Sequence, residues 1–67
     1  MMEIIVNGEK RQSLNGLTVA QLMDELQTPL QGTAVAVNGK VAKRADWEGF
    51  ILKDGDEILV ISAAYGG

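Results

Sequence analysis

The stretch from Leu17 to Pro29 carries the clearest secondary-structure signal of the chain. Thr18 is a favourable helix N-cap, and Gln21, three residues later, completes a capping box. Apolar residues then recur at helical spacing on one face: Val19, Leu22, Met23 and Leu26. Pro29 should end the helix by Thr28, because the residue before a proline avoids the helical region. A helix of about nine or ten residues is too short to be stable alone, so its apolar stripe must pack on a sheet.

The residues before this helix predict a β-hairpin. Met2–Val6 is rich in β-branched residues and reads as a strand. Its alternation puts three apolar side chains on one face: Met2, Ile4 and Val6. Asn7-Gly8 is the preferred pair for a type I′ turn, since both central residues need a positive φ. A second, polar strand therefore returns antiparallel over about Lys10–Leu14, and Asn15-Gly16 ends it.

A second hairpin follows the helix. Thr33–Val37 is a strand, with Val35 and Val37 on one face, and it turns at a further Asn-Gly pair, Asn38-Gly39. The short return strand covers Lys40–Ala42. Residues 43–50 lack strand alternation and predict a turn or a short 3₁₀ helix. Three large apolar residues in or just after this segment should close one end of the core: Trp47, Phe50 and Leu52.

The last strand should be central in the sheet. It follows the Asp54-Gly55-Asp56 turn and covers Glu57 to Ser62. Its apolar run is continuous, which predicts that both faces are at least partly covered and that it inserts beside Met2–Val6. The fold class is therefore α+β, with one domain over residues 1–67 and a mixed sheet of about four to five strands packed on one helix.

Composition excludes several classes of function. The chain has 67 residues, no cysteine and no histidine, so a disulfide, a thiolate zinc site and the common nucleophile–base pairs are missing. Ser13 and Ser62 have no candidate base nearby in sequence and read as ordinary polar strand residues. The formal charge of −3 argues against nucleic-acid binding. No apolar run approaches the ~20 residues of a membrane span. We expect a cytoplasmic protein that is not an enzyme and that binds no metal or cofactor.

The sequence ends in Ala64-Tyr65-Gly66-Gly67, directly after the apolar strand. Two glycines make a narrow and flexible tail over residues 63–67, and its carboxylate is ionised at neutral pH. Such a group can enter another protein's cleft and attack the α-phosphate of ATP. The competing interpretation is an incidental pair, which arises in roughly one chain in two hundred at a glycine usage of ~7%.

The layout and the tail together resemble the ubiquitin-like β-grasp proteins, and most closely the thiamine-pathway sulfur carrier (ThiS) family. The resemblance covers the whole chain and rests on loose motifs in combination: the first strand, Leu17-Thr18-Val19, Val35-Ala36-Val37-Asn38, Asp54-Gly55-Asp56 and the final Gly-Gly. Lys43 departs from it, because many members have proline there. Ala64-Tyr65 departs too, because an aliphatic residue followed by a small one is more usual.

The resemblance implies a chemistry for the tail. An E1-like adenylating enzyme would use ATP to adenylate the Gly67 carboxylate, with Gly66 keeping the arm slim. Sulfur from a donor such as a cysteine desulfurase would convert the adenylate to a thiocarboxylate. Thiazole synthase would then take the sulfur for the thiazole ring of thiamine. ATP would be bound by the activating enzyme, so the carrier itself needs no bound cofactor.

A docking surface should accompany the tail. If Ile58 faces the helix, then Leu59 and Ile61 face outward, as Ile5 does on the neighbouring strand. These residues would form an apolar patch leading to Tyr65, and exposed apolar patches commonly mark partner sites. Two alternatives stand beside this prediction: residues 47–52 cover the patch, or a one-residue slip inverts the faces.

Three rival functions share the fold and the tail chemistry. They are the small sulfur-carrier subunit of molybdopterin synthase, a ubiquitin-like protein modifier, and a β-grasp binding module with incidental glycines. The residues alone do not distinguish a role in thiazole formation from a role in the molybdopterin pathway. We expect the free protein to be a monomer without nucleic-acid or membrane partners, because the exposed edge of the second strand is polar.

Overall fold

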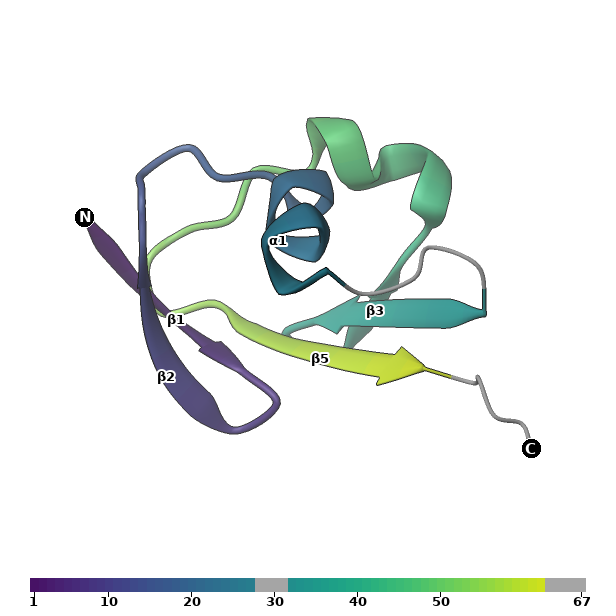
Figure 1. Cartoon of the computed structure of the whole chain (residues 1–67), viewed down its shortest axis with the longest axis horizontal. Coiled ribbons are helices and arrows are strands. Elements are labelled where there is room, and N and C mark those ends of the chain that lie inside the picture. The colour runs from purple at the N-terminus through teal and green to yellow at the C-terminus, as the bar shows by residue number, and fades with distance from the viewer. Residues whose placement is uncertain (28–31, 63–67) are drawn as a thin grey trace.

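One α-helix lies across one face of a five-stranded mixed sheet (Figure 1). The structure is a computed structural model that describes residues 1–27 and 32–62. Its elements are, in chain order, β1 (Met2–Val6), β2 (Glu9–Ser13), α1 (Val19–Leu26), β3 (Thr33–Val37), β4 (Lys40–Ala42), the 3₁₀ helix η1 (Arg44–Gly49) and β5 (Glu57–Ser62). The strand order across the sheet is β2-β1-β5-β3-β4. The last strand is therefore central, as its apolar run predicts.

Both predicted hairpins form through two-residue Asn-Gly turns. Asn7 and Gly8 have φ values of 51° and 84°, and Asn38 and Gly39 have 53° and 84°. The pairing of β1 with β2 begins directly beside the turn, at Val6↔Glu9. Because the turn uses only two residues, β2 covers Glu9–Ser13, one position earlier than the predicted strand.

The two hairpins meet through β5. This strand runs parallel to β1, with Val6 opposite Ile58, and antiparallel to β3, with Val35 opposite Val60. The chain between the hairpins passes through α1, which crosses the sheet on one side (Figure 1). The predicted order of two strands, helix, two strands and a central last strand is confirmed.

The start of α1 has the predicted capping box. The Thr18 hydroxyl accepts a hydrogen bond from the Gln21 backbone N–H at 3.1 Å, and the Gln21 side-chain oxygen accepts one from the Thr18 N–H at 2.9 Å. The helix ends at Leu26, and Gln27 adopts a left-handed conformation with φ 56°. The helix is thus shorter than the sequence suggests. The predicted stop before Pro29 lies outside the described residues.

One hydrophobic core fills the space between α1 and the sheet. Its largest fully buried side chains are Ile4, Val19, Leu22, Met23, Val35, Leu52 and Ile58. Trp47 of η1 is buried beside them, and its indole N–H donates to the Ala42 carbonyl at 2.8 Å. Phe50 packs against the same core while partly exposed. The prediction that Trp47, Phe50 and Leu52 close one end of the core is confirmed.

Candidate functional site: the open face of the sheet

The side of the sheet opposite α1 carries an apolar surface. Strand alternation places Ile4 and Ile58 in the core, so Ile5, Leu59 and Ile61 point to the other face. Leu59 is 49% exposed and Ile61 51%, while Ile5 is half-buried. The continuous apolar run of β5 predicts that both faces are at least partly covered, and this agrees with the half-exposed side chains. The structure buries the helix side and leaves these side chains half open, because α1 and η1 both lie on the helix side (Figure 1).

The second hairpin extends this surface. Across the antiparallel ladders, Ala36 lies opposite both Leu59 and Val41, and Ala34 lies opposite Ile61. Directly paired residues project from the same face, so these three belong to the same surface. Val41 is 76% exposed. We call the whole set the open-face patch: Ile5, Ala34, Ala36, Val41, Leu59 and Ile61.

Sequence reasoning found three of these residues and missed the three from the second hairpin. Ala34 and Ala36 are small and carry no strong signal by themselves. Val41 follows Asn38-Gly39 by two positions, so the register of the hairpin could have placed it opposite Ala36. The alternative that a one-residue slip inverts the faces of the last strand is excluded, because Ile58 is buried and Leu59 is exposed.

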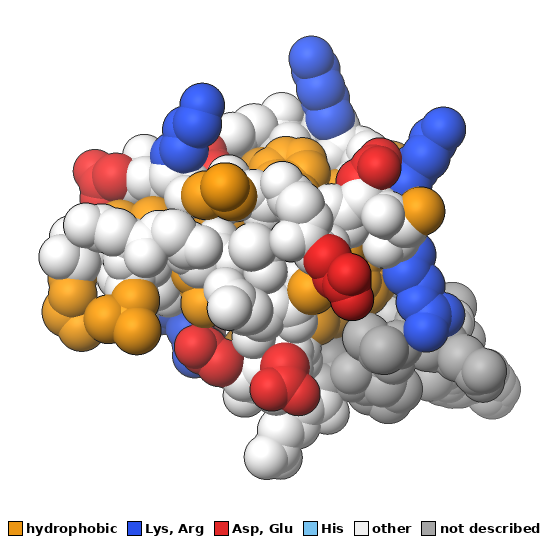
Figure 2. Space-filling model, turned by 90° about the horizontal axis from the view of Figure 1, so that it is seen from above, with side chains coloured by type: hydrophobic (Ala, Val, Ile, Leu, Met, Phe, Trp, Pro, Cys, Tyr) orange, Lys and Arg blue, Asp and Glu red, His pale blue; other side chains and the backbone are white. Residues whose placement is uncertain are grey.

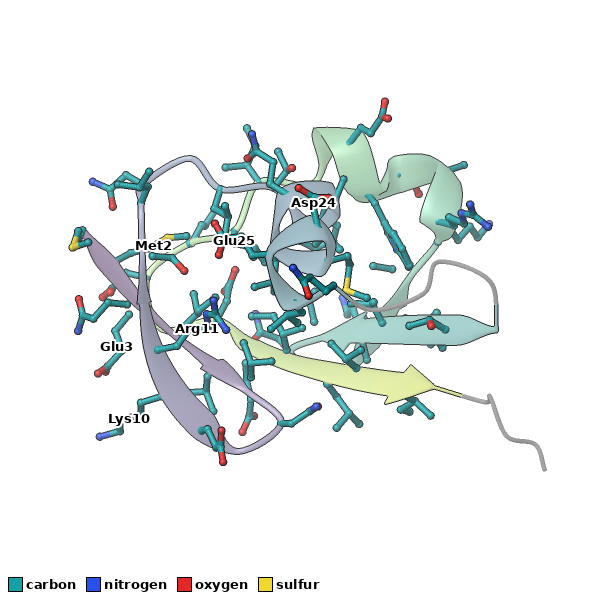
Figure 3. All side chains as sticks on the ribbon, in the orientation of Figure 1. Met2, Glu3, Lys10, Arg11, Asp24 and Glu25 are labelled. Atoms are coloured by element: carbon teal, nitrogen blue, oxygen red, sulfur yellow. The ribbon has the colours of Figure 1, made fainter. Side chains whose placement is uncertain are left out.

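Charged side chains flank the patch on both sides of Ile5. Lys10 lies opposite Ile5 in the antiparallel pair, and Glu57 lies opposite Ile5 in the parallel pair. Figure 3 shows Glu3 and Lys10 pointing away from α1, whereas Arg11 points toward it. Arg11 pairs there with Glu25 at 3.3 Å. The patch is thus apolar with charged side chains on one flank, a composition that suits a protein–protein contact.

The helix side of the molecule looks different. Viewed from that side, acidic and basic side chains are scattered over the surface, and hydrophobic ones come in small separate groups (Figure 2). This surface resembles ordinary solvent-facing protein. The open face is therefore the stronger candidate for a docking surface.

Asparagine side chains from both turns hold β5. The Val60 N–H donates to the Asn7 side-chain oxygen at 2.8 Å, just where the parallel pairing with β1 ends. On the other side, the Glu57 N–H donates to the Asn38 side-chain oxygen at 3.0 Å, and the Asn38 amide donates to Asp56 at 3.0 Å. These bonds orient the strand that carries two patch residues and leads toward the C-terminal glycines.

The predicted carrier residues lie beyond this strand. Tyr65, Gly66 and Gly67 are outside the described residues, as is the whole predicted tail, 63–67. The described chain ends at Ser62, at one end of the sheet (Figure 1). Ile61 is next to that end, so the open-face patch lies beside the point from which the tail continues.

The remaining candidates stay weak in the structure. Ser13 is 5% exposed, and its hydroxyl has no hydrogen-bond partner among the described residues. Asp54 and Asp56 accept backbone N–H bonds in a turn, from Glu3 and Lys53. Within residues 1–27 and 32–62, no cluster of three or more acidic side chains could hold a metal ion. In that same part of the chain, no helix is long and apolar enough to cross a membrane.

A five-stranded mixed sheet that grips one helix, with its central last strand leading to two glycines, defines a β-grasp protein of the ubiquitin-like class. Comparison with known proteins narrows this class. The model of the ThiS family matches residues 4–67. The sulfur carrier protein ThiS of Escherichia coli (strain K12) is 35% identical over 66 residues, which cover 98% of this chain and 100% of that protein.

Solved structures agree with the sequence match. The crystal structure of the thiamine biosynthesis protein ThiS from Geobacter metallireducens superposes with a TM-score of 0.84 at 28% identity, covering 98% of this chain and 100% of that one. A solution structure of a thiamine biosynthesis protein from the same organism gives 0.80 at 28% identity, covering 98% of this chain and 88% of that one. The chain belongs to the ThiS family of sulfur carrier proteins. It is accordingly a carrier and not an enzyme.

Proposed function

We propose that this protein carries sulfur for thiamine biosynthesis as a thiocarboxylate on Gly67. The observation that carries the proposal is the family match, which runs through to Gly67 and covers the whole E. coli sulfur carrier. The solved relatives favour thiazole formation over the molybdopterin pathway and over a protein modifier, because both are named thiamine biosynthesis proteins.

The chemistry takes place at one carboxylate. A Gly67 oxygen attacks the α-phosphate of ATP, pyrophosphate leaves, and an acyl-adenylate forms. A persulfide sulfur of the donor then attacks the acyl carbon, so that a C–S bond forms while the C–O bond to AMP breaks. A thiol of the partner next attacks the donor sulfur of this acyl disulfide, so that the S–S bond breaks, a disulfide forms on the partner and the thiocarboxylate is released. The carrier contributes the reacting carboxylate, while its partners contribute ATP binding and the sulfur. This division fits a chain without cysteine or histidine.

The amino-acid sequence of the tail suits a group that visits different active sites. Gly66 and Gly67 have no Cβ atoms, so the arm is narrow enough to enter a cleft. The rigid part of the protein is the sheet, in which β5 is bonded to neighbours on both sides. The reacting carboxylate would therefore be carried by a narrow segment that follows a strand paired on both sides.

We propose that the open-face patch docks the partners. It is apolar with charged side chains on the flank beside Ile5, and it lies beside the end of β5. The first partner is an E1-like adenylating enzyme, and the second is thiazole synthase. Because both need the tail, each would use the same face, and Tyr65 would extend the contact toward the glycines. The two partners should therefore bind in turn and compete with each other.

The remaining assignments follow from this role. Sulfur reaches the adenylating enzyme from a donor such as a cysteine desulfurase, and the pathway places the carrier in the cytoplasm. The free carrier is a monomer. Its β2 edge is short and polar, and the Arg11–Glu25 pair links that edge to the helix.

Intact mass spectrometry tests the proposed function. The protein is incubated with ATP, its adenylating enzyme and a sulfur source. We expect a mass gain that corresponds to replacement of one oxygen by sulfur, located in the C-terminal peptide. An unchanged mass, with an enzyme shown to be active on a known sulfur carrier, would argue against the proposal.

Removal of Gly67 provides the matched control. The truncated chain keeps residues 1–62 of the fold, so its circular dichroism and thermal unfolding should not change. Its ATP–pyrophosphate exchange with the adenylating enzyme should be lost, because the carboxylate is one residue short of the reacting phosphate. Normal exchange by this variant would contradict the role of Gly67.

A further inference from the structure

The sequence contains the dipeptide Asn-Gly three times, at Asn7, Asn15 and Asn38. In this dipeptide the backbone nitrogen of glycine can attack the asparagine side-chain carbonyl, because glycine has no Cβ to hinder the approach. Ammonia leaves and a five-membered succinimide forms. Water then opens the ring at either carbonyl and yields aspartate or isoaspartate. No oxidant or enzyme is needed.

Exposure does not distinguish the three sites. All three asparagines are exposed, and each is followed by a glycine with a positive φ of 84° to 86°. The difference lies in what their side chains contact. Ring closure requires rotation of the side-chain amide over the next backbone nitrogen. A side chain held by hydrogen bonds must first break them.

The side chains of Asn7 and Asn38 are held by hydrogen bonds. The Asn7 oxygen accepts from the Val60 N–H at 2.8 Å, a bond to a strand 53 residues away in sequence. The Asn38 oxygen accepts from the Glu57 N–H at 3.0 Å, while its amide group donates to Asp56 at 3.0 Å. Both asparagines also lie within two-residue turns between directly paired strands. Their side chains therefore have little freedom to rotate.

Among the described residues, the Asn15 side chain, by contrast, has no such hydrogen bonds to break. It lies in the connection between β2 and α1, where a single backbone bond from Leu17 N–H to the Leu14 carbonyl, at 3.3 Å, closes the turn. In the described part of the chain, no hydrogen bond involves the Asn15 side chain. Its φ is also not left-handed, unlike that of Asn7 and Asn38.

We propose that Asn15-Gly16 is the site of spontaneous deamidation in the folded protein and that the fold protects Asn7 and Asn38. The modification makes the formal charge of −3 one unit more negative. The isoaspartate form also lengthens the backbone just before Leu17, which is buried and whose carbonyl accepts from the Leu52 N–H at 2.8 Å. The modified connection lies at the opposite end of the molecule from Ser62 (Figure 1), so this inference is independent of the carrier function.

Peptide mapping tests the proposal. The folded protein is aged in mildly alkaline buffer, and a parallel sample is aged in concentrated urea. Cleavage after glutamate puts the three asparagines in separate peptides, because Glu9 and Glu25 lie between them. We expect Asn15 to be converted roughly tenfold faster than the others in the folded protein, since a hydrogen bond must open first at Asn7 and Asn38. In urea the three rates should converge.

The Asn15→Gln variant is the matched control, because it keeps the amide while a six-membered ring closes far more slowly. Its folded form should lose most of the conversion. Equal rates at the three sites in the folded protein would overturn the proposal. So would an Asn15 that is converted in urea but not in the folded protein, because the turn itself would then be protective.

Discussion

At the scale of single residues, two side chains hold positions that their local sequence does not favour. Ser13 buries a hydroxyl that has no partner among the described residues. Gln27 adopts a left-handed backbone conformation that glycine adopts without strain. Each is a place where a substitution should raise the stability of the protein.

We expect Ser13→Ala to increase the free energy of unfolding by about 1 kcal/mol, because a buried hydroxyl without a partner gives up its bonds to water and gains none in return. Urea denaturation monitored by Trp47 fluorescence measures the change. Thr18→Ala serves as the contrast, since it removes a hydroxyl that accepts a bond at the helix start and should cost about 1 kcal/mol. A loss of stability in Ser13→Ala would contradict the absence of a partner.

We expect Gln27→Gly to stabilise the fold by about 1 kcal/mol, the usual cost of holding a residue with a Cβ in the left-handed region. The Gln27 N–H donates to the Asp24 carbonyl at 3.1 Å, and glycine can keep this bond. Thermal unfolding measures the change. An unchanged or lower midpoint would show that the glutamine side chain stabilises the helix end in some other way.

At the scale of elements, the central strand β5 is held in the sheet by side-chain hydrogen bonds as well as by backbone pairing with its neighbours. The parallel pairing of β1 with β5 covers two residue pairs, and the Asn7 side chain then supplies the acceptor for Val60. The Asn-Gly sequence thus serves both as a tight turn and as an extension of the sheet. The strand that leads to the tail is held beyond the end of β1 by this contact.

We expect Asn7→Gly to loosen this part of β5. Glycine accepts the positive φ without strain, so the variant removes the side-chain bond while keeping the turn. Hydrogen exchange at the Val60 amide should accelerate, because the amide loses its acceptor. Gln27→Gly changes a similar backbone conformation without this bond and should leave Val60 exchange unaccelerated. Equal exchange in both variants would mean that the Asn7 contact contributes nothing.

At the scale of the whole molecule, the helix and the 3₁₀ segment lie on one side of the sheet and leave the other side open. The open-face patch combines residues from both hairpins and the central strand. It lies next to the end from which the chain continues to Gly67. Under the docking proposal, a partner that covers the patch would receive the tail at one edge of its contact surface.

We expect Leu59→Asp to weaken binding to the adenylating enzyme by more than about tenfold, or roughly 1.4 kcal/mol, because a charge enters the apolar centre of the contact. Titration calorimetry measures the affinity. Leu14→Asp is the matched control: Leu14 is 67% exposed but follows β2 at the other end of the molecule, so it should bind normally. Equal effects of the two substitutions would argue against docking through the open face.

Much of this architecture can be predicted from short stretches of sequence. Asn-Gly pairs specify two-residue turns because both central residues need positive φ, and Thr18 with Gln21 specifies the start of α1. The period of two along β5 correctly separates Ile58 from Leu59. These features depend on neighbouring residues in the chain, so local rules suffice.

Other features depend on contacts between distant parts of the chain. The sequence alone determined the two-residue turns and the helix start, because both follow from local backbone preferences. The facing of β5 needed the structure, because only the burial of Ile58 and the exposure of Leu59 exclude a slip by one residue. Only the tertiary structure decided that Ala34, Ala36 and Val41 join Leu59 and Ile61, since register across strands brings them together. It also decided that, within the part of the chain that is described, the Asn7 and Asn38 side chains are hydrogen-bonded while that of Asn15 is not, because the fold gives identical dipeptides different backbone conformations and different neighbours.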